Sequence, residues 1–262
     1  MPQEEFIITV PPQHLPLLRG QRALPAHLAY RLGRGPRLLR TASSPPPTGG
    51  LMALAQGDYN SPGPAGPFCR EVVRECVSRR FSGVLLDFEG RLPFREKLAG
   101  QLDELLARQG LRFFVPESYG LCAPHAGVLI SSALSGGTLT ARLEEAGERF
   151  GRDRVALALE RSAEDFFLPS PTGCGTPLSQ EALHRMLDRR RPCVFFSTAL
   201  CARYFTYMDR NEGAHFVLFD DDDTMLRKIG VGRAAGIRTF FLPWTEASLP
   251  GRAAIDGNGP RR

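Results

Sequence analysis

Short apolar runs, rich in β-branched and aromatic residues, recur along the whole chain at the length of buried strands. Polar and amphipathic stretches separate them, which is the arrangement expected where helices and loops join the strands. The predicted strands cover residues 6–10, 51–55, 83–88, 111–115, 127–130, 154–159, 193–196, 215–219 and 237–242.

Patterns with helical spacing lie between several of these runs. In the clearest one, Phe94, Leu98 and Leu102 repeat on one face, and Gly110 follows as a C-terminal stop. The predicted helices cover residues 67–79, 93–109, 138–150, 179–189 and 224–235. Because strands alternate with helices, the pattern predicts an α/β fold with a parallel sheet.

The chain length allows two small domains or one barrel. It has 262 residues, and a (β/α) barrel typically needs about 250. The order of the predicted elements favours one domain over residues 1–262, with a loop-rich basic part over residues 1–50.

The most informative segment is a buried strand that ends in two acids. Residues 81–86 are largely apolar, and Asp87 and Glu89 follow at alternate positions. Alternation places both side chains on one face, roughly 6 to 7 Å apart. The C-terminal strand ends of a parallel barrel form the active-site mouth. Two acids this close favour one protonated and one ionised carboxyl, as cleavage of a glycosidic bond requires.

Residues 83–89, Gly-Val-Leu-Leu-Asp-Phe-Glu, resemble the DGxxxDxE strand of glycoside hydrolase family 18, the chitinase-like enzymes. A second block resembles the last strands of the bacterial spore and cell-wall branch of that family; it comprises residues 204–209, residues 215–221, Lys228 and residues 236–237. Order and spacing agree over roughly residues 51–244. The resemblance implies a (β/α)8-type TIM barrel, irregular or truncated because the chain is short.

The resemblance also implies a mechanism and a substrate class. Glu89 would be the general acid that protonates the leaving glycosidic oxygen. Asp87 would orient the substrate's own N-acetyl group, whose carbonyl oxygen attacks the anomeric carbon in place of an enzyme nucleophile. The expected substrate is a β-linked polymer that contains N-acetylglucosamine, such as peptidoglycan, spore cortex or a chitin-like glycan. No cofactor or metal is expected.

The chain departs from the family pattern at three places. Ser82 stands where the family motif has aspartate, and Leu85 stands at a middle position that is commonly another aspartate. The usual Met-x-Tyr-Asp strand has no counterpart in residues 128–133. These departures support a second hypothesis, a catalytically inactive barrel that binds a glycan or a protein partner through the same mouth.

Other acids and aromatic residues are candidates for contacts with the substrate. Most of them follow predicted strands, where a barrel places its mouth. The resemblance places the floor tryptophan near Trp244, while Tyr119 is a candidate replacement for the missing tyrosine. For each of these residues, a solvated loop or a core position is the alternative. The full set of candidate substrate-binding residues is Glu117, Tyr119, Glu160, Tyr207, Asp220 and Trp244.

Four consecutive aspartates at 220–223 suggest either a metal site or a helix start. The run lacks the glycine and the terminal glutamate of a calcium loop. Asp222, Asp223 or Thr224 can cap the free amides of the helix that follows, and acids favour the positive end of its dipole. We therefore expect capping, with a sugar contact of Asp220 as the alternative.

Charge and cysteine usage add limits on location and partners. The net charge of +5 is concentrated before residue 57, since six arginines and no acid lie between Phe6 and Gly57. Such a stripe fits nucleic acid or another anionic polymer, but no nucleic-acid motif accompanies it, so nucleic acid is not an expected partner. No apolar run is long enough to span a membrane, no secretory signal is visible, and the six cysteines show no zinc spacing. We expect a cytoplasmic protein with reduced thiols.

Overall fold

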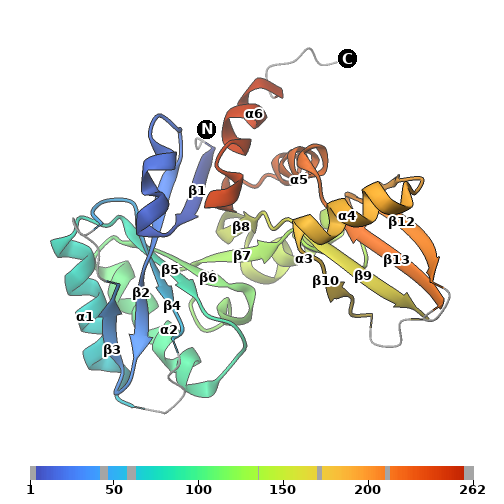
Figure 1. The fold of residues 1–262 in the computed structure, drawn as a ribbon. Helices are drawn as coiled ribbons and strands as arrows, with labels where there is room; N and C mark the ends of the chain where they lie inside the picture. The colour runs from blue at the N-terminus through green and yellow to red at the C-terminus, as the bar shows by residue number, and fades with distance from the viewer. Residues whose placement is uncertain are drawn as a thin grey trace. The chain divides into compact units, whose positions relative to one another are not determined.

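The computed structural model describes residues 4–41, 47–57, 63–134, 136–169, 173–209 and 213–256 (Figure 1). Its contacts divide the chain into two compact units. The first unit comprises Met1–Ile130, Glu145–Ala158 and Gly236–Arg262, and the second comprises Ser131–Glu144 and Leu159–Ala235. Each unit is described by itself. The expected single domain over residues 1–262 stays a prediction.

A closed ring of eight strands is the centre of the first unit. The ring runs β1-β14-β8-β7-β6-β5-β4-β2, and a parallel pairing of β1 with β2 closes it. β5, which carries the candidate acids, pairs in parallel with β4 and β6. The predicted TIM barrel is therefore confirmed. The strands are β1 (Glu5–Val10), β2 (Leu24–Gly33), β4 (Leu51–Ala55), β5 (Gly83–Asp87), β6 (Arg112–Pro116), β7 (Gly127–Ser131), β8 (Val155–Ala158) and β14 (Thr239–Pro243).

One face of every ring strand contributes to the barrel interior. Side chains of different size fill it together, for example Ala53 on β4, Leu85 on β5 and Phe114 on β6. Phe114 and Phe241 meet edge to face with ring centroids 4.9 Å apart. A barrel of eight strands has an interior just wide enough for such side chains to fill. The interior is thus a packed core, and only the strand ends are free to carry chemistry.

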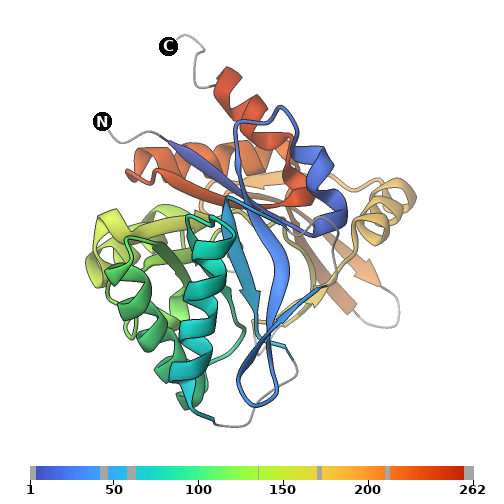
Figure 2. The same ribbon diagram turned by 90° about the vertical axis from the view of Figure 1, so that its left-hand side faces the viewer.

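The helices around the ring are incomplete, as the prediction of an irregular barrel anticipated. Connections with a full helix follow β4, β5, β7 and β8, whereas β1 and β6 are followed only by short 3-10 turns. β2 turns back into an antiparallel strand instead of a helix (Figure 2). The elements concerned are η1 (Pro12–Leu18), β3 (Arg37–Arg40), α1 (Ala65–Ser78), α2 (Pro93–Arg108), η2 (Glu117–Tyr119), α3 (Leu139–Phe150), η3 (Arg152–Arg154), η4 (Trp244–Glu246) and α6 (Leu249–Asp256).

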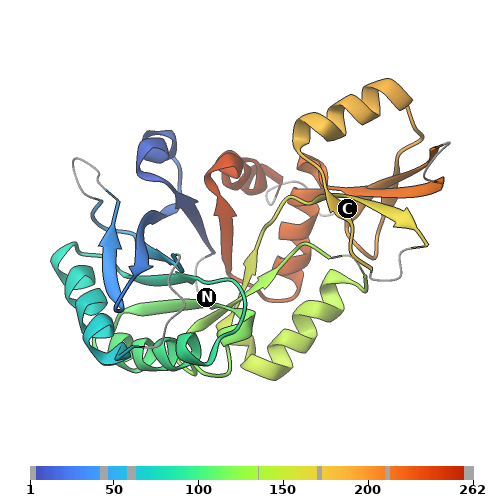
Figure 3. The same cartoon turned by 60° about the horizontal axis from the view of Figure 1, so that its bottom comes forward.

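The second unit is built on an antiparallel sheet in the order β10-β9-β13-β12-β11. Helix α4 covers one face of it (Figure 3), where Leu183 packs with Phe205 and Val217. The helix begins after Ser179, whose side chain accepts a hydrogen bond from the Ala182 amide. The elements are β9 (Ala163–Leu168), β10 (Thr176–Pro177), α4 (Gln180–Arg190), β11 (Phe195–Ser197), β12 (Ala202–Asp209), β13 (Gly213–Phe219) and α5 (Asp222–Ala234).

The N-terminal part is less loop-rich than expected, because it contains strand β2, which the sequence pattern did not predict. Strand β2 is the longest of the ring, yet its sequence carries Pro25, His27 and Arg31 among its apolar residues. A register shift between His27 and Tyr30 further disturbs its alternation.

In the described part of the chain, no helix is long and apolar enough to cross a membrane.

Candidate functional site

Asp87 and Glu89 lie at the mouth end of strand β5. Gly83 and Leu85 on the same strand face the barrel interior side of the sheet, and alternation gives Asp87 that same face. Both acidic residues are exposed, whereas Phe88 between them is buried. The two carboxyl groups are thus presented to solvent above a closed apolar core. Both residues thus lie at the end of a barrel strand, as predicted, while the predicted approach of their side chains on one face stays a prediction.

Two side chains hold the backbone of Glu89 in place. The Glu89 amide donates to Oε1 of Gln56 at 3.0 Å, and Nη1 of Arg95 donates to the Glu89 carbonyl at 2.7 Å. Arg95 Nη1 also donates to Gln56 Oε1 at 2.8 Å, which closes the set. Arg95 is only 5% exposed and lies over the Phe88 ring. Hydrogen bonds to both its amide and its carbonyl therefore fix the backbone of Glu89.

Sequence reasoning missed this pair of side chains, although one signal was available. Arg95 lies in the first turn of helix α2, where the positive end of the helix dipole disfavours a cation. A cation at such a position indicates a local interaction whose stabilisation outweighs the unfavourable dipole. Here the interaction is the pair of hydrogen bonds from Arg95 to Gln56 and to the loop that carries Glu89.

Tyr119 has a different environment from the predicted one. Its side chain is fully buried, and its hydroxyl donates to the Gly90 carbonyl at 2.7 Å. Its ring meets Phe88 edge to face, and burial raises the pKa of its hydroxyl. Because no surface of Tyr119 is exposed, it does not replace the missing substrate-binding tyrosine. It supports the loop after β5 from below.

Glu117 and Trp244 lie at other strand ends of the first unit. Glu117, after β6, is half-buried and forms an ion pair with Arg149 at 3.6 Å. Trp244, after β14, is also half-buried, and His14 stacks on it with ring centroids 3.8 Å apart and planes 9° apart. Their predicted contacts with a sugar stay predictions.

Leu85 explains how the barrel accommodates one departure from the family pattern. The side chain is 4% exposed and belongs to the interior cluster directly below the level of Asp87. A carboxylate at this position would need polar partners that the surrounding alanine, leucine and phenylalanine side chains do not supply. The interior below Asp87 is accordingly apolar, and Asp87 has no acidic neighbour at the preceding inward position.

In the second unit, Glu160 and Tyr207 have separate surroundings. Glu160 is exposed, and its carboxylate accepts a 2.6 Å hydrogen bond from Ser131. Tyr207 donates to Asp165 at 2.6 Å and stacks on His215, which contacts the other oxygen of the same carboxylate. Burial and the bond to Asp165 raise the pKa of Tyr207. These contacts place Tyr207 in a structural network, and its contact with a sugar stays a prediction.

The sugar contact considered for Asp220 is wrong, because this residue is buried. It is 1% exposed and accepts from Nζ of Lys228 at 2.7 Å, a lysine that is equally buried. Ser162 and Thr224 donate to it as well. Asp220 therefore compensates a buried cation.

The helix cap that was expected in this run of acids is confirmed, but at a neighbouring residue. Asp221 accepts from the Thr224 amide while the Thr224 hydroxyl accepts from the Asp221 amide, and this reciprocal pair forms a capping box. In the described part of the chain, no group of three potential metal ligands occurs.

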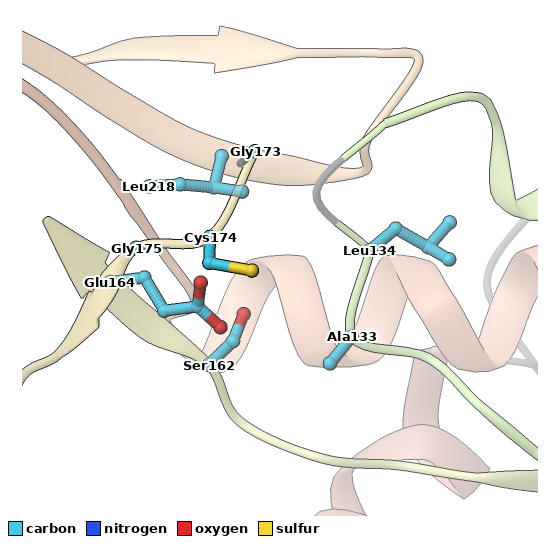
Figure 4. Close-up of a pocket in the computed structure, with 8 residues that line it drawn as sticks. All are labelled: Ala133, Leu134, Ser162, Glu164, Gly173, Cys174, Gly175 and Leu218. Carbon is cyan, nitrogen blue, oxygen red and sulfur yellow. The ribbon is translucent and has the colours of Figure 1, made fainter. Parts of the chain in front are cut away.

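A pocket of about 340 Å³ lies in the second unit. Figure 4 shows that the Cys174 thiol, the Glu164 carboxylate and the Ser162 hydroxyl are among the polar groups that line it. Ser162 is already engaged, since its amide and its hydroxyl both donate to Asp220. The lining residues are Ala133, Leu134, Ser162, Glu164, Gly173, Cys174, Gly175 and Leu218. They include no aromatic ring on which a pyranose could stack, so we place the candidate site at Asp87 and Glu89.

Comparisons with known proteins were informative only at the level of structure. No protein-family model and no curated protein matches the sequence. A chitinase from Chromobacterium violaceum is similar in structure, with 14% identity and a TM-score of 0.70, over 98% of this chain and 100% of that chain. The spore cortex-lytic enzyme SleL from Bacillus cereus shows 13% identity and a TM-score of 0.67, over 96% and 74%.

A plant enzyme gives the same result. The class V chitinase from Nicotiana tobaccum shows 12% identity and a TM-score of 0.67, over 98% of this chain and 99% of that chain. A mutant of that chitinase has been solved in complex with NAG4. At such identities the likeness establishes the fold. The chain thus has the chitinase-like TIM-barrel fold that its carboxylate strand indicated.

Proposed function

We propose that this chain is a glycoside hydrolase that cleaves a β-linked polymer containing N-acetylglucosamine. The single observation that carries the proposal is the position of Asp87 and Glu89. Both are exposed at the mouth end of a central barrel strand, in a fold shared with chitinases. Active sites of TIM barrels lie at this end.

The proposed reaction uses the two acids in different roles. Glu89 donates a proton to the glycosidic oxygen as the bond to the anomeric carbon breaks. Asp87 orients the substrate's N-acetyl group, whose carbonyl oxygen attacks that carbon, and its negative charge stabilises the resulting oxazolinium ion. Water then attacks the anomeric carbon, its bond to the N-acetyl oxygen breaks, and the Glu89 carboxylate takes up the proton of that water, so that configuration is retained. The bonds from Gln56 and Arg95 to the Glu89 backbone support a fixed position for the acid.

The substrates to be tested are peptidoglycan, spore cortex and chitin-like glycans. Purified protein is incubated with chromogenic chitooligosaccharides and with purified peptidoglycan, and released reducing ends are measured. Hydrolysis that depends on Glu89 supports the proposal. Binding without release of reducing ends contradicts it.

A second candidate function is a catalytically inactive barrel that binds a glycan or a protein partner. Two observations favour it: Leu85 fills the barrel interior below Asp87, and Tyr119 is buried under the loop after β5. The same experiment separates the two functions, because only the enzyme releases reducing ends.

A further inference from the structure

The hairpin of β2 and β3 carries arginines at the level of the candidate acids. Arg31 on β2 is in register with Ala55 on β4, and Ala55 is in register with Asp87 on β5. Adjacent strands lie about 4.8 Å apart, so the backbones of Arg31 and Asp87 are separated by about 10 Å at the same height of the barrel. β2 continues to Gly33, beyond the residue paired with the end of β4. The tip of the hairpin therefore projects beyond the C-terminal strand ends that form the mouth; it is the blue hairpin at the bottom of Figure 2.

The face on which Arg31 lies follows from its neighbours. Tyr30 points to the helix side of the sheet, where its hydroxyl donates to Glu75 of α1 at 3.0 Å. Alternation then gives Arg31 the opposite side, the one that Asp87 shares. Arg37 on β3 is in register with Gly33, two residues after Arg31, and so lies on that same face.

A close contact fixes this hairpin. The Leu39 side chain, also on the inner face, packs against Gly33, where an added Cβ would come within 2.5 Å of Leu39 Cγ. Only glycine fits there without displacing the leucine. The two arginines consequently flank a small apolar patch on a paired, two-stranded support, which is a more rigid position than a loop.

Among the residues that the structure describes, no ion pair neutralises the charges on this inner face. Arg31 and Arg37 are exposed, and neither forms an ion pair with any residue that the structure describes. On the helix side the opposite holds, since Arg40 pairs with Glu75 at 3.4 Å. The chain contains no acid between Phe6 and Gly57. Uncompensated positive charge beside a cleft attracts anionic ligands.

We propose that Arg31 and Arg37 bind carboxylate groups on the glycan, so that the barrel prefers an acidic polysaccharide over a neutral one. The inference rests on the proposed function, because the arginines rise from the mouth that Asp87 and Glu89 occupy. Guanidinium groups bind carboxylates through paired, charge-assisted hydrogen bonds. Sugars that extend from the cleavage point toward β2 would meet them.

The test compares two soluble chitin derivatives, anionic carboxymethyl chitin and neutral glycol chitin. We expect the R31Q/R37Q double variant to lose about tenfold in kcat/KM on carboxymethyl chitin and less than about twofold on glycol chitin. Wild-type activity on the anionic polymer should fall as salt is raised, because salt screens exposed charges. Equal losses on both polymers, or no loss on either, would overturn the proposal.

A matched control removes the same charge elsewhere. Both Arg80, which follows α1, and Arg108, the last residue of α2, are exposed at the end of the barrel opposite the mouth. The R80Q/R108Q variant should hydrolyse both polymers like the wild type. Thermal unfolding of all three proteins checks that the substitutions leave the fold unchanged.

A binding readout separates this inference from the proposed function. If the wild type hydrolyses neither polymer, affinity electrophoresis in carboxymethyl chitin decides the question of charge, and the proposed hydrolase is judged separately on peptidoglycan. Retardation of the wild type and the control, but not of R31Q/R37Q, supports carboxylate binding by these arginines. Equal migration of all three proteins overturns it.

Discussion

Two acid-rich segments of this chain have the same residue types and opposite environments. At the end of β5, Asp87 and Glu89 are exposed, and Gln56 and Arg95 hold the backbone that carries Glu89. At the start of α5, Asp220 is buried against Lys228. The carboxylates of the first segment face solvent, where the proposed function requires them, while those of the second form hydrogen bonds and ion pairs within the protein. Position in the fold, not acidity, decides which role an aspartate has.

The largest expected effect is on catalysis at the first segment. Glu89→Gln keeps the shape and hydrogen-bonding capacity of the side chain but removes the transferable proton. General acid catalysis contributes roughly 10²- to 10⁴-fold, so kcat should fall by about that factor with little change in unfolding temperature. Initial rates of reducing-end release measure the effect. An active wild type whose Glu89→Gln variant retains full turnover would remove Glu89 from the proposed site.

A large effect on stability is expected at the second segment. Asp220→Ala leaves the ammonium group of Lys228 buried without its counter-charge. Removal of one partner of a buried ion pair typically lowers the free energy of unfolding by about 3 to 5 kcal/mol. Urea denaturation followed by circular dichroism measures it. Asp223→Ala, which removes a half-exposed acid whose ion pairs with Arg203 and Arg227 are open to solvent, is the control and should cost less than about 1 kcal/mol.

The outcome at Asp220 also sharpens the comparison between the two segments. If Asp220→Ala left stability unchanged and instead raised KM, the residue would belong to a ligand site, and burial would be a poor guide to role. We expect the reverse, with KM per folded molecule unaltered.

An intermediate effect is expected from Arg95, which positions Glu89 without reaching the substrate. Arg95→Met fills a similar volume but removes the donors to Gln56 and to the Glu89 carbonyl. A shift of the acid by about 1 Å can cost about 10²-fold in rate, so kcat should fall by about 10- to 100-fold with KM little changed. Arg108→Met at the exposed end of the same helix should leave both constants unchanged. A change confined to KM would contradict a positioning role.

The sequence predicted the barrel better than it predicted the surroundings of the site. Strands such as 51–55 and 83–87 are continuous apolar runs because both faces of a parallel barrel strand are buried, and such runs are visible without any structure. Strand β2 was not predicted because His27 and Arg31 interrupt its apolar run, although Arg31 proves to lie at the mouth. The residues that depart from the strand pattern are those with another task.

Tertiary contacts account for the errors at individual site residues. Tyr119 follows a barrel strand, as a residue of the mouth should, yet its hydroxyl turns to the Gly90 carbonyl and its ring is covered. Asp220 and Asp221 are adjacent and chemically identical in sequence. Their tertiary partners separate them, since Lys228 and Ser162 bind the buried Asp220 while Asp221 caps the helix through Thr224.

The smallest expected effect belongs to that cap, Asp221→Asn. Asparagine caps a helix about as well as aspartate, so the variant loses mainly the negative charge near the helix dipole and the ion pair with Arg203. Because these interactions are partly exposed, the free energy of unfolding should fall by about 1 kcal/mol or less at neutral pH and low salt. Enzymatic activity should not change.

The pH dependence of this small difference tests its cause. Burial alone would raise the pKa of Asp221, but the bonds from the Thr224 amide and from Arg203 outweigh burial and hold it below its usual value. A carboxyl whose pKa is lower in the folded state stabilises the protein above its unfolded pKa of about 3.9. That contribution is lost as pH falls through the lower folded value. The wild type and Asp221→Asn should therefore differ in urea midpoint at pH 7 and converge in acid. A difference that persists unchanged at the lowest pH would assign the effect to the altered cap geometry instead of the charge.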